Sequence, residues 1–220
     1  MFPLGDASRR PQHQPIVTVG LIALNAFVFV LELQGGEPFI RRWSVVPVSL
    51  SGLNWLTVLV LTAMFLHAGW SHLFGNMLFL WAFGPQIEDA MGRGRFLGFY
   101  LLGGVVAFGA QIAVEPDSTI PMLGASGAIA AVMGAFLITY PRDRIRTLII
   151  FGFLIGIRLI PALVWVGFWF LMQLFNEVGA LATVHTGGVA YVAHIGGFVM
   201  GMASARLFEN SERLGYQRWH

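Results

Sequence analysis

Long apolar segments recur along this chain, and they constrain its fold more than any other feature does. Runs of about 20 apolar residues have the length that crosses the hydrocarbon core of a bilayer. The chain has 220 residues, of which 56% are hydrophobic and only 11% are charged, whereas a typical soluble domain has about 25% charged residues. So few charges cannot cover a soluble surface. We therefore expect an all-α polytopic membrane protein with a single domain.

We count six membrane spans, so the expected fold is a six-transmembrane-helix bundle. The insert 35–70 holds an apolar stretch, Trp55 to Leu66, that is too short for a span and suits an interfacial or re-entrant segment better. The first run, Ile16 to Leu33, is too long for a signal-peptide core, and we interpret it as a retained signal anchor. The expected spans are 16–34, 71–91, 95–114, 126–140, 159–180 and 188–208.

The arginines predict how the spans are oriented. All 13 basic residues are arginines, and basic loops generally face the cytoplasm. If the arginine-rich loops share one side, the polar tails 1–15 and 209–220 both lie in the cytoplasm, and Arg41 and Arg42 are the exceptions. The residues that set this orientation are Arg9, Arg10, Arg93, Arg95, Arg142, Arg144, Arg146, Arg206, Arg213 and Arg218.

The fourth apolar segment is too short to cross a bilayer alone. Ser126 to Tyr140 is 15 residues, which gives about 22 Å of helix against a hydrocarbon core of about 30 Å. Pro141 and the arginines after it place the C-terminal end at the interface. Ser126 must then lie below the outer surface, and residues 117–125 must dip into the membrane. Such backbone survives only when it is buried in protein or lines a wet cavity.

A serine at a helix N-terminus at that depth has chemical consequences. Free backbone N–H groups and the positive end of the helix dipole would stabilise an oxyanion beside Ser126. Gly124 and Gly127 give the backbone freedom and let a substrate approach closely. A structural role is the alternative, since serine is a common N-cap and small residues are common where membrane helices pack. The Gly-x-Ser-x-Gly elbow of hydrolases is not matched, because Ala128 takes its last place.

Ionisable side chains inside a membrane are costly and point to function. The sixth span carries His194, and its Gly197 and Gly201 are spaced to allow close packing on a neighbouring helix. In the second span, His72 and Asn76 are four residues apart and share one helix face. Spans two, four and six run in the same direction, and each carries its polar groups in its first turns. We therefore expect these groups at similar depth.

These residues together predict a Ser–His dyad. Ser126 is the expected nucleophile and His194 its general base, while His72 and Asn76 can donate to an oxyanion. No Asp or Glu is placed to orient the base, so we expect a dyad and no triad.

Other interpretations of the histidines remain open. A lone membrane histidine can simply hydrogen-bond a neighbouring helix. His67, His72 and His194 could together bind zinc, but the first two are five residues apart and no carboxylate completes a set, so we expect no metal and no other cofactor. His67 precedes Gly69 and is expected to fix the loop by hydrogen bonding. Scattered arginines argue against nucleic acid, and cysteine chemistry is excluded because the chain has no cysteine.

The motifs resemble those of the rhomboid family of intramembrane serine proteases. Their order and direction agree with that family, the resemblance covers about residues 16–208, and the six spans fit the basic prokaryotic form. The three motifs are His67-x4-His72-x3-Asn76, Gly124-Ala-Ser126-Gly127 and Ala193-His194-x-Gly196-Gly197.

The resemblance implies a role for each motif. Ser126 would attack the scissile carbonyl, and His194 would take its proton and return it to the leaving amine. His72, Asn76 and the Ser126 backbone N–H would hold the oxyanion. The substrates would be transmembrane proteins, cut within or beside a membrane segment in the lipid bilayer, and the location would be the inner membrane of a bacterium.

The resemblance also implies two structural roles and shows two departures. Trp165–Glu177 would form a lateral gate, and Glu88 would tie the second span to the cytoplasmic ends. Many relatives carry an aromatic side chain where this chain has Ala130, so Tyr191 or a phenylalanine from a neighbouring helix is expected to support His194. The Trp-Arg pair common in the first loop is reversed here, as Arg42-Trp43.

Two rival functions differ in what they require. An inactive rhomboid-like protein would bind membrane clients without cutting them, but such a protein normally lacks the serine or the histidine. A transporter should show two repeated halves with broken helices, and the sequence has no such repeat.

Overall fold

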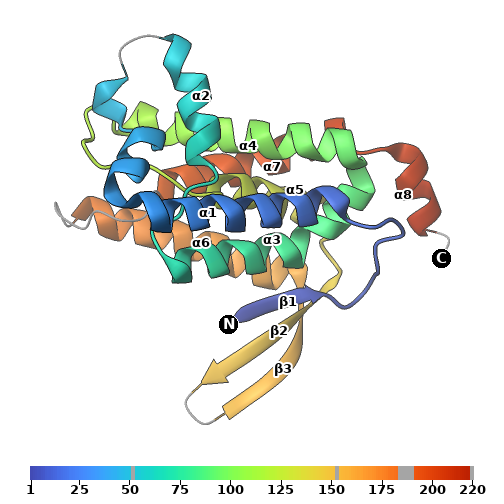
Figure 1. Cartoon of the computed structure of the whole chain (residues 1–220). Helices are drawn as coiled ribbons and strands as arrows, with labels where there is room; N and C mark the ends of the chain where they lie inside the picture. The colour runs from blue at the N-terminus through green and yellow to red at the C-terminus, as the bar shows by residue number, and fades with distance from the viewer. Residues whose placement is uncertain (51–52, 152–153, 183–190, 219–220) are drawn as a thin grey trace.

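The computed structural model describes residues 1–50, 53–151, 154–182 and 191–218. Within these residues, most of the chain is helical, and a small sheet joins the helices at one side (Figure 1). The helices are α1 (Ile16–Trp43), a 3₁₀ turn η1 (Pro47–Ser49), α2 (Leu53–Ala63), α3 (Trp70–Met91), α4 (Arg93–Val114), α5 (Ser126–Thr139), α6 (Ala162–Ala182), α7 (Tyr191–Phe208) and α8 (Ser211–Arg218). The strands are β1 (Phe2–Asp6), β2 (Arg144–Phe151) and β3 (Leu154–Pro161).

Helix α5 lies at the centre of the bundle, and every residue from Gly127 to Phe136 is buried. Its contact with α7 brings backbone against backbone. A Cβ on Gly197 would lie 2.1 Å from the carbonyl oxygen of Gly127, and one on Gly201 would lie 2.0 Å from that of Ala131. Both distances are too short for any side chain, so the prediction that these two glycines permit close packing is confirmed.

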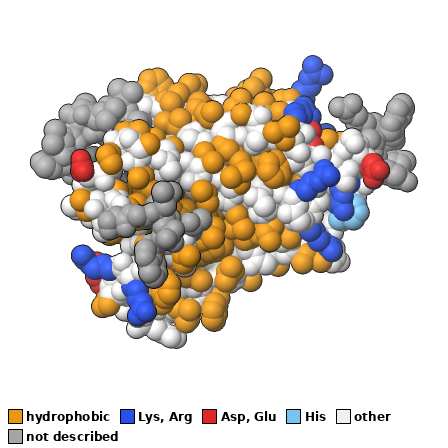
Figure 2. Space-filling model, turned by 90° about the horizontal axis from the view of Figure 1, so that it is seen from above, with side chains coloured by type: hydrophobic (Ala, Val, Ile, Leu, Met, Phe, Trp, Pro, Cys, Tyr) orange, Lys and Arg blue, Asp and Glu red, His pale blue; other side chains and the backbone are white. Residues whose placement is uncertain are grey.

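The outside of the bundle is apolar along its flank. Hydrophobic side chains cover that flank, and charged side chains gather towards the ends (Figure 2). Among the described helices, α1 and α4 are long and apolar enough to cross a membrane by length and composition, while α5 and residues 162–175 of α6 are shorter apolar helices. The six predicted spans overlap α1, α3, α4, α5, α6 and α7, although residues 188–190 of the sixth lie outside the described part.

The sheet corrects the expectation of an all-α fold. Strands β2 and β3 form an antiparallel hairpin, and β1 pairs with β2 in the order β1-β2-β3. The N-terminal tail is therefore partly a strand, and the fifth helix begins at Ala162 where the sequence suggested 159. The signal was present, because residues 144–161 are rich in isoleucine, which favours strands. Arg144 and Arg146, which alternate with apolar residues in β2, had been interpreted as part of a cytoplasmic loop.

Several helix boundaries also differ from the predicted ones. Helix α1 continues to Trp43 through a kink at Gly36, where φ is 60° and ψ is −155°, a conformation that suits glycine. The insert contains α2, and the C-terminal tail contains α8. The predicted short fourth helix is confirmed, since α5 has 14 residues and starts at Ser126.

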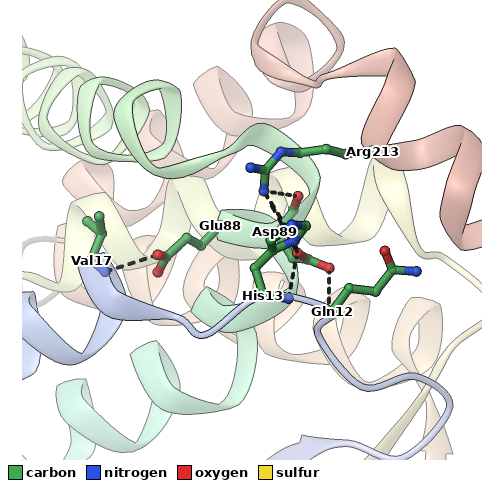
Figure 3. Close-up of polar contacts among 6 residues, drawn as sticks. All are labelled: Gln12, His13, Val17, Glu88, Asp89 and Arg213. Carbon is green, nitrogen blue, oxygen red and sulfur yellow. Dashed lines mark hydrogen bonds and ion pairs between the residues drawn. The ribbon is translucent and has the colours of Figure 1, made fainter.

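Two buried carboxylates, Glu88 and Asp89, lie near the C-terminal end of α3, a region here called the closed end of the bundle (Figure 3). Glu88 accepts hydrogen bonds from the backbone N–H groups of Val17 and Thr18, at 3.0 and 2.7 Å, and from the Thr18 hydroxyl at 2.8 Å. These bonds satisfy N–H groups that the first turn of α1 leaves free. Asp89 accepts from the backbone and ring of His13 and from the backbone of Gln12. The α1 entry is thereby fixed to the end of α3.

Candidate active site

The loop before α5 descends into the protein. Met122 exchanges two backbone hydrogen bonds with Val45, of 2.7 and 3.1 Å, and the Gly124 N–H donates to the Ala63 carbonyl at 2.9 Å. Met122, Gly124 and Ala125 are buried. This is the buried, hydrogen-bonded backbone that irregular structure at membrane depth requires. It delivers Ser126 to the first position of α5.

Ser126 and His194 lie within hydrogen-bond distance. The Ser126 Oγ is 2.7 Å from His194 Nε2, although the two residues come from α5 and α7. On the other side of the ring, His194 Nδ1 is 2.8 Å from Oε1 of Gln173 on α6. An amide oxygen can only accept, so Nδ1 carries the proton and Nε2 is left with a lone pair towards the serine. The histidine is therefore in the tautomer that a general base needs.

Gln173 was not identified from the sequence. From the sequence, only Asp or Glu was considered as the group that orients His194. An amide oxygen on a neighbouring helix can fix the same tautomer. The available signal was that Gln173 is the first polar residue after the apolar run 162–172 of α6.

The His194 ring is also held by its neighbours. The Tyr191 ring packs edge-on with its centroid 6.4 Å away, and the Trp169 ring lies at 6.2 Å. The expected aromatic support thus comes from Tyr191 and from a tryptophan where a phenylalanine was suggested. Gln111 of α4 accepts a hydrogen bond of 3.1 Å from the Ala193 N–H. It satisfies one of the free N–H groups in the first turn of α7.

His72 approaches the serine from α3. Its Nδ1 accepts a 3.3 Å hydrogen bond from the Ala68 backbone N–H, so the ring proton lies on Nε2. That nitrogen would be 3.0 Å from a Cβ built on Gly124, and Ser126 Oγ would be 3.8 Å from the same point. Gly124 has φ of +121°, which non-glycine residues rarely adopt. Both the conformation and the space therefore require glycine here.

Asn76 lies one turn further along α3, in the same cavity as His72. Its side chain is buried, and its Nδ2 has no hydrogen-bond partner among the described residues. A buried amide donor without a partner costs free energy. Nδ2 is therefore available to bind an oxygen of a molecule that enters the cavity.

His67 and the loop around it are held by Glu32, a buried acid of α1. The Glu32 carboxylate accepts the His67 backbone N–H at 2.9 and 3.1 Å, and the His67 ring packs edge-on against His72, with centroids 5.1 Å apart. His67 thus contributes to the loop that carries His72. Glu32 was not singled out in the sequence.

These groups line one cavity of about 480 Å³ between α3, α5, α6 and α7. Hydrophobic side chains form much of its wall, with the polar groups gathered in one part. Such a combination is typical of a binding site. Its residues include Ser71, His72, Asn76, Phe79, Ser126, Met133, Trp169, Gln173 and His194. In the described part of the chain, no three His, Asp or Glu side chains are grouped as metal ligands would be.

The predicted site residues therefore meet in one place. Ser126, His194, His72 and Asn76 all line the cavity. Gly127, predicted to support the site, packs against α4 and α7, since a Cβ there would lie 2.4 Å from that of Ala107. Ala130 is buried and does not line the cavity.

Comparison with known proteins identifies the family. The Rhomboid domain family model matches residues 54–210, and this chain belongs to the rhomboid family, a family of membrane proteins. It is 33% identical to Rhomboid protease GluP of Bacillus subtilis over 84% of this chain and 34% of that protein. It is 29% identical to Rhomboid protein 1, mitochondrial, of Saccharomyces cerevisiae over 86% of this chain and 52% of that protein.

A further relative is the Presenilin-associated rhomboid-like protein, mitochondrial, of Bos taurus, with 30% identity over 83% of this chain and 46% of that protein. The chain thus spans between a third and about half of the length of these relatives. These relatives include one protein named as a protease and two named as mitochondrial.

Proposed function

We propose that this chain is an intramembrane serine endopeptidase that cleaves transmembrane segments of membrane proteins with a Ser126–His194 dyad. The observation that carries the proposal is the 2.7 Å contact between Ser126 Oγ and His194 Nε2, with Nδ1 bonded to Gln173. This arrangement pairs a nucleophile with a base whose tautomer is fixed.

In the first step, Ser126 Oγ attacks the scissile carbonyl carbon while its proton passes to His194 Nε2. The carbonyl oxygen becomes an oxyanion. Three donors are available to it: the His72 Nε2–H, the Asn76 amide and the Ser126 backbone N–H, which has no acceptor inside α5 because it opens the helix. Donors placed in advance in a site with little water lower the barrier strongly.

In the second step, His194 returns the proton to the leaving amine, the C–N bond breaks, and an acyl ester remains on Ser126. Water then repeats the sequence with His194 as base, which releases the acid product and regenerates the hydroxyl. No metal or other cofactor is required by these steps. His67, Gly124 and Gly127 support them by fixing the loop and the space around the dyad.

The proposed setting is a membrane domain of six spans, residues 16–208, with both tails on the cytoplasmic side of a bacterial inner membrane. The apolar flank of the bundle supports embedding in lipid, and the arginine distribution supports this orientation. The substrate would enter from the bilayer beside Trp165–Glu177 of α6. Leu163, Val164, Phe168, Leu171 and Phe175 of this helix are exposed, as expected for a helix that faces lipid.

The test is cleavage of a transmembrane substrate, with a reporter at each end, in proteoliposomes. Ser126→Ala should abolish cleavage. The matched control is Ser204→Ala, which should cleave like the wild type. Among the described residues, the Ser204 hydroxyl bonds only to Met200 of the same helix. If Ser126→Ala still cut at the wild-type rate, the dyad would be wrong. If the wild type bound the substrate without cutting it, the client-binding alternative would replace the protease.

A further inference from the structure

The hairpin formed by β2 and β3 projects away from the helices, below them in Figure 1, and its two faces differ. In an antiparallel pair, directly opposed residues point to the same side. One side carries Ile145 and Thr147, which are fully buried, and packs towards the bundle. The opposite side includes the pairs Ile150–Ile155, Leu148–Ile157 and Arg146–Leu159.

That opposite side, here called the outer face, is apolar and exposed. Ile150, Ile155, Ile157 and Leu159 expose between 49% and 69% of their surface. Phe2 of β1 pairs with Leu148 and extends the same face, 45% exposed. An apolar patch of this kind marks a surface that meets another apolar phase.

The charges of the hairpin are arranged along its length. Arg144 and Arg146 lie on the outer face near the bundle, whereas the isoleucines lie towards the other end of the strands. Arg142 precedes the hairpin, and all three arginines are exposed. Within the described residues, no salt bridge joins any of the three to a carboxylate. Two acids lie nearby: Asp143 is paired with Arg9, and Asp6 of β1, which is opposite Ile145, accepts the Ser8 backbone N–H.

The base of the hairpin is attached to the bundle by backbone hydrogen bonds. The Ala162 N–H donates to the Asp143 carbonyl at 2.7 Å, and the Leu163 N–H donates to that of Pro141 at 3.1 Å. The first N–H groups of α6 are thereby satisfied by the chain that precedes β2. The outer face ends at exposed Pro161, and the exposed apolar residues of α6 begin two residues later, at Leu163. The exposed apolar residues of β3 are thus followed in the chain by those of α6, which the proposed setting places in lipid.

We propose that the outer face of the β2–β3 hairpin is a docking surface for anionic lipid, with its isoleucines in the acyl boundary and Arg142, Arg144 and Arg146 at the headgroups. An amphipathic element that lies at the interface binds through buried apolar area together with attraction to anionic lipid. Arginines beside a membrane helix add to this attraction when the leaflet carries negative charge. Such a lipid-binding surface requires that the bundle lies in a bilayer, and it does not depend on whether the Ser126–His194 dyad is active.

The absence of cysteine from the chain gives a direct test. Ile157→Cys on the outer face and Arg158→Cys on the opposite face are matched positions, adjacent in one strand and both exposed. Each full-length variant is labelled with an environment-sensitive fluorophore and placed, one copy per disc, in nanodiscs that contain a lipid-borne quencher. One set of discs is phosphatidylcholine, and the other also contains phosphatidylglycerol.

We expect the label at position 157 to be quenched at least about twofold more strongly than the label at 158, and more strongly with phosphatidylglycerol present. Arg144→Gln with Arg146→Gln should remove the difference between the two lipid mixtures. Equal quenching at 157 and 158, or no effect of the anionic lipid, would overturn the proposal. A label at 157 that becomes protected only with two copies per disc would overturn it too, because the face would then be covered by a second copy.

Discussion

The two polar clusters of this bundle differ in their groups and in how their hydrogen bonds are used: one is built on carboxylates, the other on a serine, histidines and side-chain amides. At the closed end, Glu88 and Asp89 accept bonds from the segment that leads into α1, and both oxygens of each carboxylate have partners. In the cavity, the Asn76 Nδ2 is buried and has no partner among the described residues. An unpaired buried donor costs free energy, so Asn76 Nδ2 is a group that a molecule in the cavity can use, whereas the satisfied carboxylates join α1 to α3.

Because of this difference, we expect mutations in the two clusters to affect different properties of the protein. Mutations in the cavity should reduce turnover strongly and stability little, because Asn76 Nδ2 has no partner among the described residues and the side chains of Ser126, His194 and Gln173 bond to one another. Mutations at the closed end should reduce stability and leave the turnover of the folded protein unchanged. The predictions below test this separation, from the largest effect on cleavage to the smallest.

His194→Ala should lower the cleavage rate by about 1000-fold or more, because the base and its proton transfers are lost. The thermal midpoint should change little. Single-turnover cleavage in proteoliposomes measures the rate, and a melting curve in detergent measures the thermal midpoint. A variant that cleaved at the wild-type rate would show that another group serves as base.

Asn76→Ala should lower kcat by about 10- to 1000-fold, the range for loss of one oxyanion donor. KM should change little, because the donor acts on charge that develops in the transition state. The free energy of unfolding should change little, since Asn76 Nδ2 has no hydrogen-bond partner among the described residues. A clear loss of stability without a loss of kcat would make Asn76 a structural residue.

Gln173→Met should lower kcat by about tenfold, because the oxygen that fixes the proton on His194 Nδ1 is lost while the side chain keeps its size. Gln173→Glu keeps an acceptor in place and should retain most of the activity. Comparison of kcat for the two variants is the measurement. Equal losses in both would mean that Gln173 acts through packing alone.

Glu88→Gln should leave kcat of the folded protein within about twofold but lower the free energy of unfolding by about 2 kcal/mol, since charge-assisted bonds to Val17 and Thr18 are weakened. The control is Glu212→Gln, on exposed α8, which should melt like the wild type. If Glu88→Gln melted like the wild type, Glu88 would not stabilise the junction of α1 and α3.

The sequence was most informative where depth in a membrane restricts the backbone. The length from Ser126 to Pro141 predicted the short central helix, and the spacing of Gly197 and Gly201 predicted its close contact with α7. The direction of the spans predicted that Ser126, His72 and His194 would be neighbours. Each lies in the first turns of its span, and the three spans run in the same direction, so the three residues lie at similar depth. These constraints are local in sequence or follow from topology.

The sequence was least informative where the partner comes from a distant helix. Gln173 and Glu32 act through contacts 21 and 35 residues away, and no spacing rule connects them to His194 or His67. The sheet was missed for a different reason. Arginine at alternate positions of β2 resembled a polar loop, while its pairing with the N-terminal strand is a long-range contact that no local pattern reports.

The measurement that tests the central claim most directly is labelling with a fluorophosphonate, which reacts covalently only with an activated serine. The purified full-length protein in detergent is compared with Ser126→Ala and with the Ser204→Ala control. We predict that the wild type and Ser204→Ala label equally and that Ser126→Ala does not label. Labelling that persisted in Ser126→Ala, or a folded wild type that failed to label, would contradict a Ser126–His194 dyad.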